Sequence, residues 1–159
     1  MIFYSLNEVL AMAIKIEENG YQIYSQLAKE NRNEKLKELF SFLAIEEWRH
    51  KETFQNISNK LKTSPYQLPY SWEEVQPYLS AITDSRFFTG EEKVFSLIKN
   101  ATTEEEIIEL ALAFEKETLL FYYEILNLVA EEDKPTILKL INEEKNHIKK
   151  LKAVKGDLK

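Results

Sequence analysis

The sequence predicts an all-α protein, a four-helix bundle built from two helical hairpins that a long crossover joins. Three observations predict this fold. Only three Gly and four Pro occur in 159 residues, and alternating apolar and polar residues are scarce, so the composition favours helix. Four long segments carry apolar residues at helical spacing. Capping residues stand near the starts of these segments.

The first hairpin is predicted over residues 5–61. Residues 5–8 (Ser-Leu-Asn-Glu) form a capping box, with Ser at the N-cap and Glu three residues later. This helix should run to about Glu30. The polar break at residues 31–33 then separates it from a second helix over about 34–61. So short a connection places the two helices antiparallel.

The second hairpin begins with another capping box at residues 103–106 (Thr-Glu-Glu-Glu). Its first helix should run to about Glu131. Asp133 and Pro135 then open the last helix, because Pro fits the first helical turn, where no intrahelical N–H is needed. That helix should end just before Gly156.

The crossover is predicted over about 63–101, because three of the four Pro lie there. Short helices are expected after Ser71 and after Thr89. Six aromatic residues of this segment should pack it onto the bundle rather than bind a ligand: Tyr66, Tyr70, Trp72, Tyr78, Phe87 and Phe88. Residues 1–159 are expected to form one domain.

Composition and charge exclude several classes of protein. There are no cysteines, which excludes disulfides, iron–sulfur clusters and thiolate zinc sites. The formal net charge of −6 offers no basic excess for nucleic acid. No apolar stretch approaches the roughly 20 residues that span a bilayer, so no membrane partner is expected. The first residues do not resemble a signal peptide, and a cytoplasmic location is expected.

Every long helix carries a carboxylate near the middle of its core-facing stripe. A buried, unpaired carboxylate costs several kcal/mol, and four of them together repel one another. Two divalent cations would cancel the four charges, and two imidazoles would add one neutral ligand to each metal. The candidate ligands are Glu17, Glu47, His50, Glu115, Glu144 and His147. This set matches the ligands of di-iron and di-manganese carboxylate bundles.

The spacing within the second and fourth long helices supports this set. Glu and His stand three residues apart in both, so each pair shares one helix face. Both histidines of the chain lie in this motif. The step from Glu47 to Glu144 is 97, as is the step from His50 to His147. Glu17 and Glu115 stand 98 apart. The sequence therefore predicts a duplicated hairpin with a pseudo-twofold axis between the two metals.

Three further residues lie beside the predicted site. Tyr24 and Tyr122 each follow a proposed ligand by seven residues, on the same helix face. They would either donate hydrogen bonds to ligand carboxylates or serve only as core tyrosines. Gly20 would either leave space above the metals for a small oxidant or let two helices approach closely.

At these residues the chain resembles the rubrerythrin group of the ferritin-like superfamily. The resemblance covers nearly the whole chain and includes residues 13–24 (Ala-Ile-Lys-Ile-Glu-Glu-Asn-Gly-Tyr-Gln-Ile-Tyr), a phrase typical of small rubrerythrin-like proteins. It implies a ferritin-like bundle in which all six candidates bind two iron ions. Glu47 and Glu144 would bridge the metals. Manganese or zinc would also accept these ligands.

Two departures from the family pattern stand out. Rubrerythrins usually carry a C-terminal rubredoxin domain, whereas this sequence contains no cysteine, so an external electron donor such as rubredoxin is expected. Rubrerythrins also carry an extra Glu one turn after the ligand of the third long helix. Thr118 stands there, and Gly20 is its counterpart in the first helix. The resemblance further implies a homodimer.

Three functions are compatible with this sequence. The leading hypothesis is a di-iron oxidoreductase that reduces hydrogen peroxide or reacts with dioxygen, as in a response to oxidative stress. The second is an iron-handling ferroxidase. The third is a metal-binding helical module without redox activity.

Overall fold

The computed structural model describes residues 5–64, 68, 71–85, 87–88 and 91–158, with the side chains of 91–94 excepted. These residues contain six helices and no strand, which confirms the predicted fold class. The helices are α1 (Leu6–Glu30), α2 (Glu34–Thr63), α3 (Trp72–Thr83), α4 (Glu91–Asn100), α5 (Glu104–Leu128) and α6 (Lys134–Asp157).

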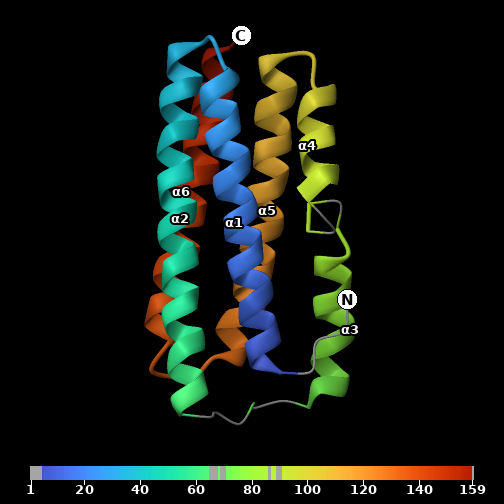
Figure 1. Ribbon diagram of the computed structural model, residues 1–159, viewed down its shortest axis with the longest axis vertical. Helices are drawn as coiled ribbons and strands as arrows, with labels where there is room; N and C mark the ends of the chain where they lie inside the picture. Colours follow the sequence, from blue (N-terminus) through green and yellow to red (C-terminus); the bar gives the residue numbers. More distant parts are fainter. Residues whose placement is uncertain (1–4, 65–67, 69–70, 86, 89–90, 159) are drawn as a thin grey trace.

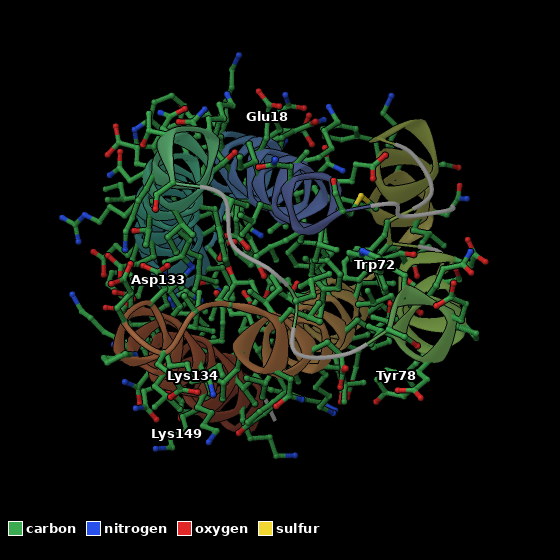
Figure 2. The ribbon with its side chains drawn as sticks, turned by 90° about the horizontal axis from the view of Figure 1, so that it is seen from below. Glu18, Trp72, Tyr78, Asp133, Lys134 and Lys149 are labelled. Atoms are coloured by element: carbon green, nitrogen blue, oxygen red, sulfur yellow. The ribbon has the colours of Figure 1, made fainter. Side chains whose placement is uncertain are left out.

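Four long helices form the bundle (Figure 1). The helices α1 and α2 make one hairpin and α5 and α6 make the other, while α1 packs beside α5 and α2 beside α6. The chain runs in opposite directions along each of these neighbouring pairs. Viewed along the bundle axis, the four helices surround a filled centre (Figure 2). The middles of all four therefore lie at similar heights.

The crossover runs along the outside of α1 and α5 (Figure 1). It contains α3, which packs on α5, and α4, which contacts both α1 and α5. Phe87 and Phe88 are buried against Phe114, as predicted. Tyr78 is 51% exposed, so the prediction was wrong there: its position on α3 faces away from the bundle. The predicted start of α4 at Thr89, together with Tyr66 and Tyr70, lies outside the described residues.

Side-chain caps begin three of the four long helices. Ser5 accepts a hydrogen bond from the backbone N–H of Glu8, and Asn33 accepts from two N–H groups of the first turn of α2. Thr103 and Glu106 make the full reciprocal capping box of α5. These bonds satisfy N–H groups that have no partner inside a helix. The sequence therefore located these helix starts through local chemistry.

The end of α5 differs from the prediction. The helix stops at Leu128 instead of Glu131, and its C-cap Val129 is extended and buried. The backbone N–H of Asp133 then bonds to the Ala130 carbonyl in a tight turn. Lys60 of α2 also holds this turn through ion pairs at 2.6 and 3.1 Å.

Two other helices run further than predicted. The helix α2 continues two residues past Leu61, to Thr63, and α6 passes through Gly156 to Asp157. The extra turn of α6 is held by a hydrogen bond from the Leu158 N–H to the Val154 carbonyl and by a 3.0 Å ion pair between Asp157 and Lys35. Glycine in a helix costs only about 1 kcal/mol relative to alanine, so Gly156 does not by itself end α6.

The core follows the predicted core-facing positions. The positions expected to face the core at helical spacing are buried on α1 and α5, for example Leu10 and Ile108. On α2 and α6 they are also buried, except the last ones, Leu61 and Val154, which are half-buried. In the part of the chain that the structure describes, no helix is both long and apolar enough to cross a membrane. The centre of this core is polar, and there the six candidate ligands lie.

Candidate metal centre

All six predicted ligands lie at the centre of the bundle. Each sits near the middle of its helix, so the antiparallel packing brings them to one level. Their side chains are completely or almost completely inaccessible to solvent, with exposed fractions of 0–1%: Glu17, Glu47, His50, Glu115, Glu144 and His147. Four carboxylates thus share one dry interior, which is unfavourable unless protons or cations compensate their charges.

The ligands form two groups, each compact enough to hold one ion. One group is Glu17, Glu47, His50 and Glu144, and the other is Glu47, Glu115, Glu144 and His147. Within each group the candidate ligand atoms lie within 4.8 Å of one another. Glu47 and Glu144 belong to both groups. A carboxylate shared by two groups can bridge two metals through its two oxygens.

Each histidine directs its Nδ1 atom toward the carboxylates. Nδ1 of His50 lies 2.7 Å from Glu144 and 3.5 Å from Glu17. Nδ1 of His147 lies 3.1 Å from Glu144 and 3.5 Å from Glu47. The two imidazole rings are nearly parallel, with an angle of 17° and centroids 5.5 Å apart. Nδ1 is therefore the nitrogen that each histidine offers to a metal.

Burial favours the protonated form of two carboxyl groups. It raises the pKa of Glu47 well above its ordinary value, and the charges of neighbouring carboxylates raise it further. Burial and the charge of Glu144 also raise the pKa of Glu115 to about 8. Without cations, these groups hold protons at neutral pH because the site cannot accommodate four negative charges.

The histidines and Glu144 show the opposite behaviour. Burial alone would raise the pKa of Glu144, but the charge of His50 and the hydrogen bond with His147 lower it. Burial alone would lower the pKa of each histidine, but the surrounding carboxylates raise both. Imidazolium groups thus stand in for cations in the metal-free protein, and a metal would have to displace their protons.

The polar atoms of the site are poorly satisfied within the protein. Among the described residues, several buried ligand atoms have no partner in hydrogen-bond geometry: Glu17 Oε2, both oxygens of Glu47, His50 Nδ1, Glu115 Oε2 and Glu144 Oε1. Buried polar groups are nearly always hydrogen-bonded. These oxygen and nitrogen atoms converge on one place and are the donor types that iron, manganese and zinc accept. The residues present therefore fit a pair of divalent metal ions.

Two tyrosines connect the hairpins at this site. Tyr24 of α1 donates a hydrogen bond of 2.5 Å to Glu115 of α5. Tyr122 of α5 donates a short hydrogen bond to Glu17 of α1. Of the two interpretations that the sequence left open, the structure thus shows hydrogen bonding to the predicted ligand carboxylates. Each bond occupies one carboxylate oxygen and leaves the other for a metal.

Gly20 makes room for a ligand carboxylate. A Cβ atom at this position would lie 2.8 Å from Oε2 of Glu47. Of the two roles considered from the sequence, this is the close approach of two helices, since the space that Gly20 leaves is filled by a side chain of α2. Thr118 is fully buried one turn after Glu115, and its hydroxyl has no hydrogen-bond partner among the described residues.

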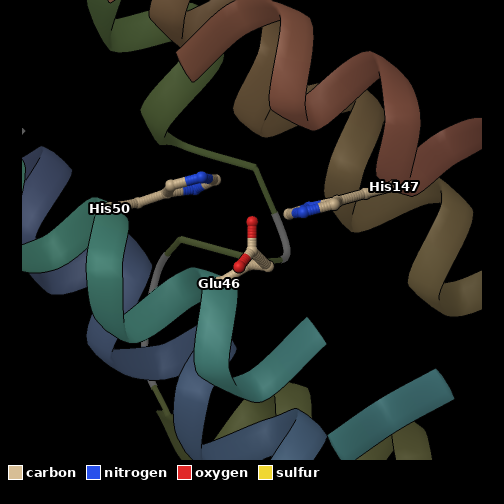
Figure 3. Close-up of side chains that lie close together, drawn as sticks. All are labelled: Glu46, His50 and His147. Atoms are coloured by element: carbon tan, nitrogen blue, oxygen red, sulfur yellow. The ribbon is translucent and has the colours of Figure 1, made fainter. Parts of the chain in front are cut away.

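One contact at the site was missed by the sequence analysis. Glu143 places Oε2 3.2 Å from Nε2 of His50. The repeated Glu-Glu-x-x-His pattern was the available signal: in both hairpins the ligand Glu follows another Glu. The equivalent residue, Glu46, lies between His50 and His147 (Figure 3).

Comparison with known proteins supports this interpretation. Searches of curated proteins and of solved structures gave no match. The family model described as Rubrerythrin matches residues 8–155, which include every predicted ligand and nearly the whole of the four long helices. This chain therefore belongs to the rubrerythrin family.

Proposed function

We propose that this protein is a di-iron oxidoreductase that reduces hydrogen peroxide, or reacts with dioxygen, with electrons from an external donor. The observation that carries the proposal is the pair of four-residue groups that share Glu47 and Glu144. Two iron ions held there would supply one electron each, which matches the two-electron reduction of hydrogen peroxide to water.

The protein's own residues would fix the geometry of this centre. Glu17 and His50 would hold one ion and Glu115 and His147 the other, while Glu47 and Glu144 would serve both. The tyrosine hydroxyls restrict the rotation of Glu17 and Glu115, because each holds one carboxylate oxygen. A site whose ligands are already oriented loses little entropy when metal binds.

The position of Thr118 supports the proposal that the substrate is a small oxygen-containing molecule. Its buried hydroxyl lies one helical turn from Glu115 and has no hydrogen-bond partner among the described residues. A hydroxyl can donate to an oxygen atom of a molecule bound at the metals. Glutamate, which rubrerythrins usually carry here, would instead add a further negative charge.

The electron donor is proposed to be a separate protein. The sequence has no cysteine to hold an iron–sulfur site. A small iron–sulfur protein such as rubredoxin would return the metals to the ferrous state between turnovers. A cytoplasmic location, where such donors occur in reduced form, is part of this proposal.

Anaerobic loading with ferrous iron, followed by stopped-flow mixing, tests the proposal. We expect the protein to bind two iron ions and to oxidise both per molecule of hydrogen peroxide, as followed by ultraviolet absorbance, with metal analysis of the same sample. A faster reaction with dioxygen than with peroxide would favour a ferroxidase. Bound iron that neither oxidant reaches would contradict an oxidoreductase.

A pair of adjacent glutamates provides the matched control. Glu17→Gln removes a predicted ligand and should reduce bound iron from two ions to one. Glu18→Gln changes a neighbouring side chain that is 37% exposed and pairs with Lys15 and Lys51, and it should leave both the iron content and the rate unchanged. Equal effects of the two variants would mean that Glu17 is not a ligand.

A further inference from the structure

The pseudo-twofold repeat is broken beside the metal ligands. Glu46 and Glu143 stand 97 positions apart, as do Glu47 and Glu144. Both precede a ligand Glu directly and lie on the side of the site where α2 packs beside α6. The residues three positions later differ, however: Arg49 follows Glu46, whereas Asn146 follows Glu143.

Glu143 of the second hairpin contacts His50 of the first hairpin. Glu143 lies 3.2 Å from Nε2 of His50 and 30% of its side chain is exposed. Its cationic neighbour, Lys139, is 3.8 Å away and 77% exposed, which is too far for a hydrogen bond and leaves the carboxylate available to His50. An acceptor on Nε2 fixes the orientation of the ring and makes Nδ1 a stronger ligand.

His147, the histidine of the second hairpin, lacks an equivalent contact with Glu46. Nε2 of His147 is buried and has no hydrogen-bond partner among the described residues. Glu46 lies within 4.8 Å of ring nitrogens of both histidines and is placed between the two rings (Figure 3). Its Oε1 bonds instead to Arg49 at 2.5 Å. The glutamate that could support His147 is therefore held by a cation.

We propose that Arg49 makes the two metal sites unequal by keeping Glu46 from His147. The site with His50, supported by Glu143, binds its metal more tightly, and the site with His147 binds the second metal more weakly. Loss of such a supporting hydrogen bond typically lowers metal affinity 10- to 100-fold. This inference rests on the proposed metal centre and assigns Glu46, Arg49 and Glu143 as positioning residues.

Titration of the metal-free protein with Co(II) tests the inference. The ligand-field absorption of Co(II) reports the ligands of each bound ion, and calorimetry gives the two affinities. We expect two separate binding steps in the unmodified protein, about 10-fold or more apart in affinity. Binding of two ions with equal affinity would overturn the inference but leave the metal centre intact. No binding at all would refute the proposed function itself.

The variant Arg49→Asn introduces asparagine, the residue at the equivalent position 146 of the second hairpin, into the first hairpin. Glu46 is then free to accept from His147 Nε2, and we expect the weaker site to gain about 10-fold in affinity. The double variant Glu46→Ala/Arg49→Asn should lose this gain, because the gain acts through the Glu46 carboxylate. Retention of the gain in the double variant would overturn the inference.

Two further variants separate positioning from general electrostatics. Arg32→Asn removes the same charge in the exposed turn between α1 and α2 and should leave both affinities unchanged. If it strengthens the weaker site as much as Arg49→Asn does, the effect is one of net charge and the inference fails. Glu143→Gln should weaken only the tighter site, and weakening of both sites equally would contradict the assignment of Glu143 to His50.

Discussion

Individual residues of the centre can bind either protons or metal ions. The folded protein raises the pKa of Glu115 to about 8, mainly through burial, from an ordinary value of 4.5. It also raises the pKa values of Glu47 and of both histidines. Metal must displace these protons, so metal binding is linked to pH.

Metal affinity should therefore rise with pH. Between pH 6 and 8 we expect the affinity for Co(II) to increase by up to about tenfold per pH unit for each proton displaced. Calorimetric titrations in two buffers of different ionisation enthalpy count the protons released. The Glu115→Gln variant should release fewer protons when metal binds, because glutamine has no carboxyl proton to lose. An affinity that does not change over this range would refute the assigned protonation.

The stability of the metal-free protein should change in the opposite direction. Glu115 keeps its proton in the folded state up to about pH 8, whereas the unfolded chain loses it near 4.5. The folded state binds more protons in this window, so the free energy of unfolding falls as pH rises from about 4.5 to 8. The raised pKa values of the histidines add to the decline above pH 6.5.

The ligand residues were accessible to sequence reasoning because helical spacing alone decides which residues share a helix face. All six candidates converge in the structure, and the offset of 97 predicted the matching of the two histidines. The partner of His50 was not predicted. The repeated Glu-Glu-x-x-His pattern places Glu143 beside the site, but whether its carboxylate reaches Nε2 depends on side-chain rotation and on the separation of α2 and α6.

At the scale of the helices, the contact between α1 and α2 depends on one small residue. Gly20 of α1 lies where a Cβ would meet the Glu47 carboxylate of α2 at 2.8 Å. Glycine in a helix interior costs roughly 0.5–1 kcal/mol relative to alanine. The chain carries this cost at the site, where the absence of a Cβ leaves room for the Glu47 carboxylate.

The two helical glycines should respond differently to alanine. Gly20→Ala should displace Glu47 and reduce bound metal, with the helical content unchanged. Gly156→Ala, in the last turn of α6 with nothing within 4 Å of its Cβ, should retain full metal content and raise the free energy of unfolding by about 0.5–1 kcal/mol. Metal analysis and chemical unfolding distinguish them. If the Gly20→Ala protein still bound two metals tightly, the Glu47 side chain would be accommodated in another conformation.

Helix starts were predicted better than helix ends. Caps such as Ser5 and Thr103 act through bonds to the next three residues, which a sequence reveals directly. The turn that follows α5 pairs with Lys60 of another helix. Asp157, beyond Gly156 in α6, likewise pairs with Lys35 of α2. Such contacts between distant segments cannot be read from the local sequence.

For the whole molecule, metal should act as a major source of stability. An ion at 100 times its dissociation constant stabilises a folded protein by about 2.7 kcal/mol. In a protein of this size, each kcal/mol raises the melting temperature by about 2–4 °C. Two occupied sites should therefore raise it by roughly 10–20 °C, and a chelator should reverse this rise.

Thermal unfolding of the ferrous-loaded protein with and without chelator measures this effect. The variant Glu47→Gln, which lacks a ligand of both proposed sites, should show little response to either metal or chelator. Identical melting curves for the loaded and the chelated protein would contradict a stabilising centre. The expected homodimer stays a prediction that light scattering can test.

The two tyrosine contacts have a consequence for how such a molecule could arise. The tyrosine of each hairpin donates a hydrogen bond to a glutamate of the other hairpin, so neither hairpin forms both contacts alone. A lone hairpin that paired with its own copy would regenerate both contacts, since symmetry carries one into the other. Fusion of two such copies into one gene would have released every position to mutate separately. The difference between Arg49 and Asn146, which occupy equivalent positions in the two hairpins, is an example of such divergence.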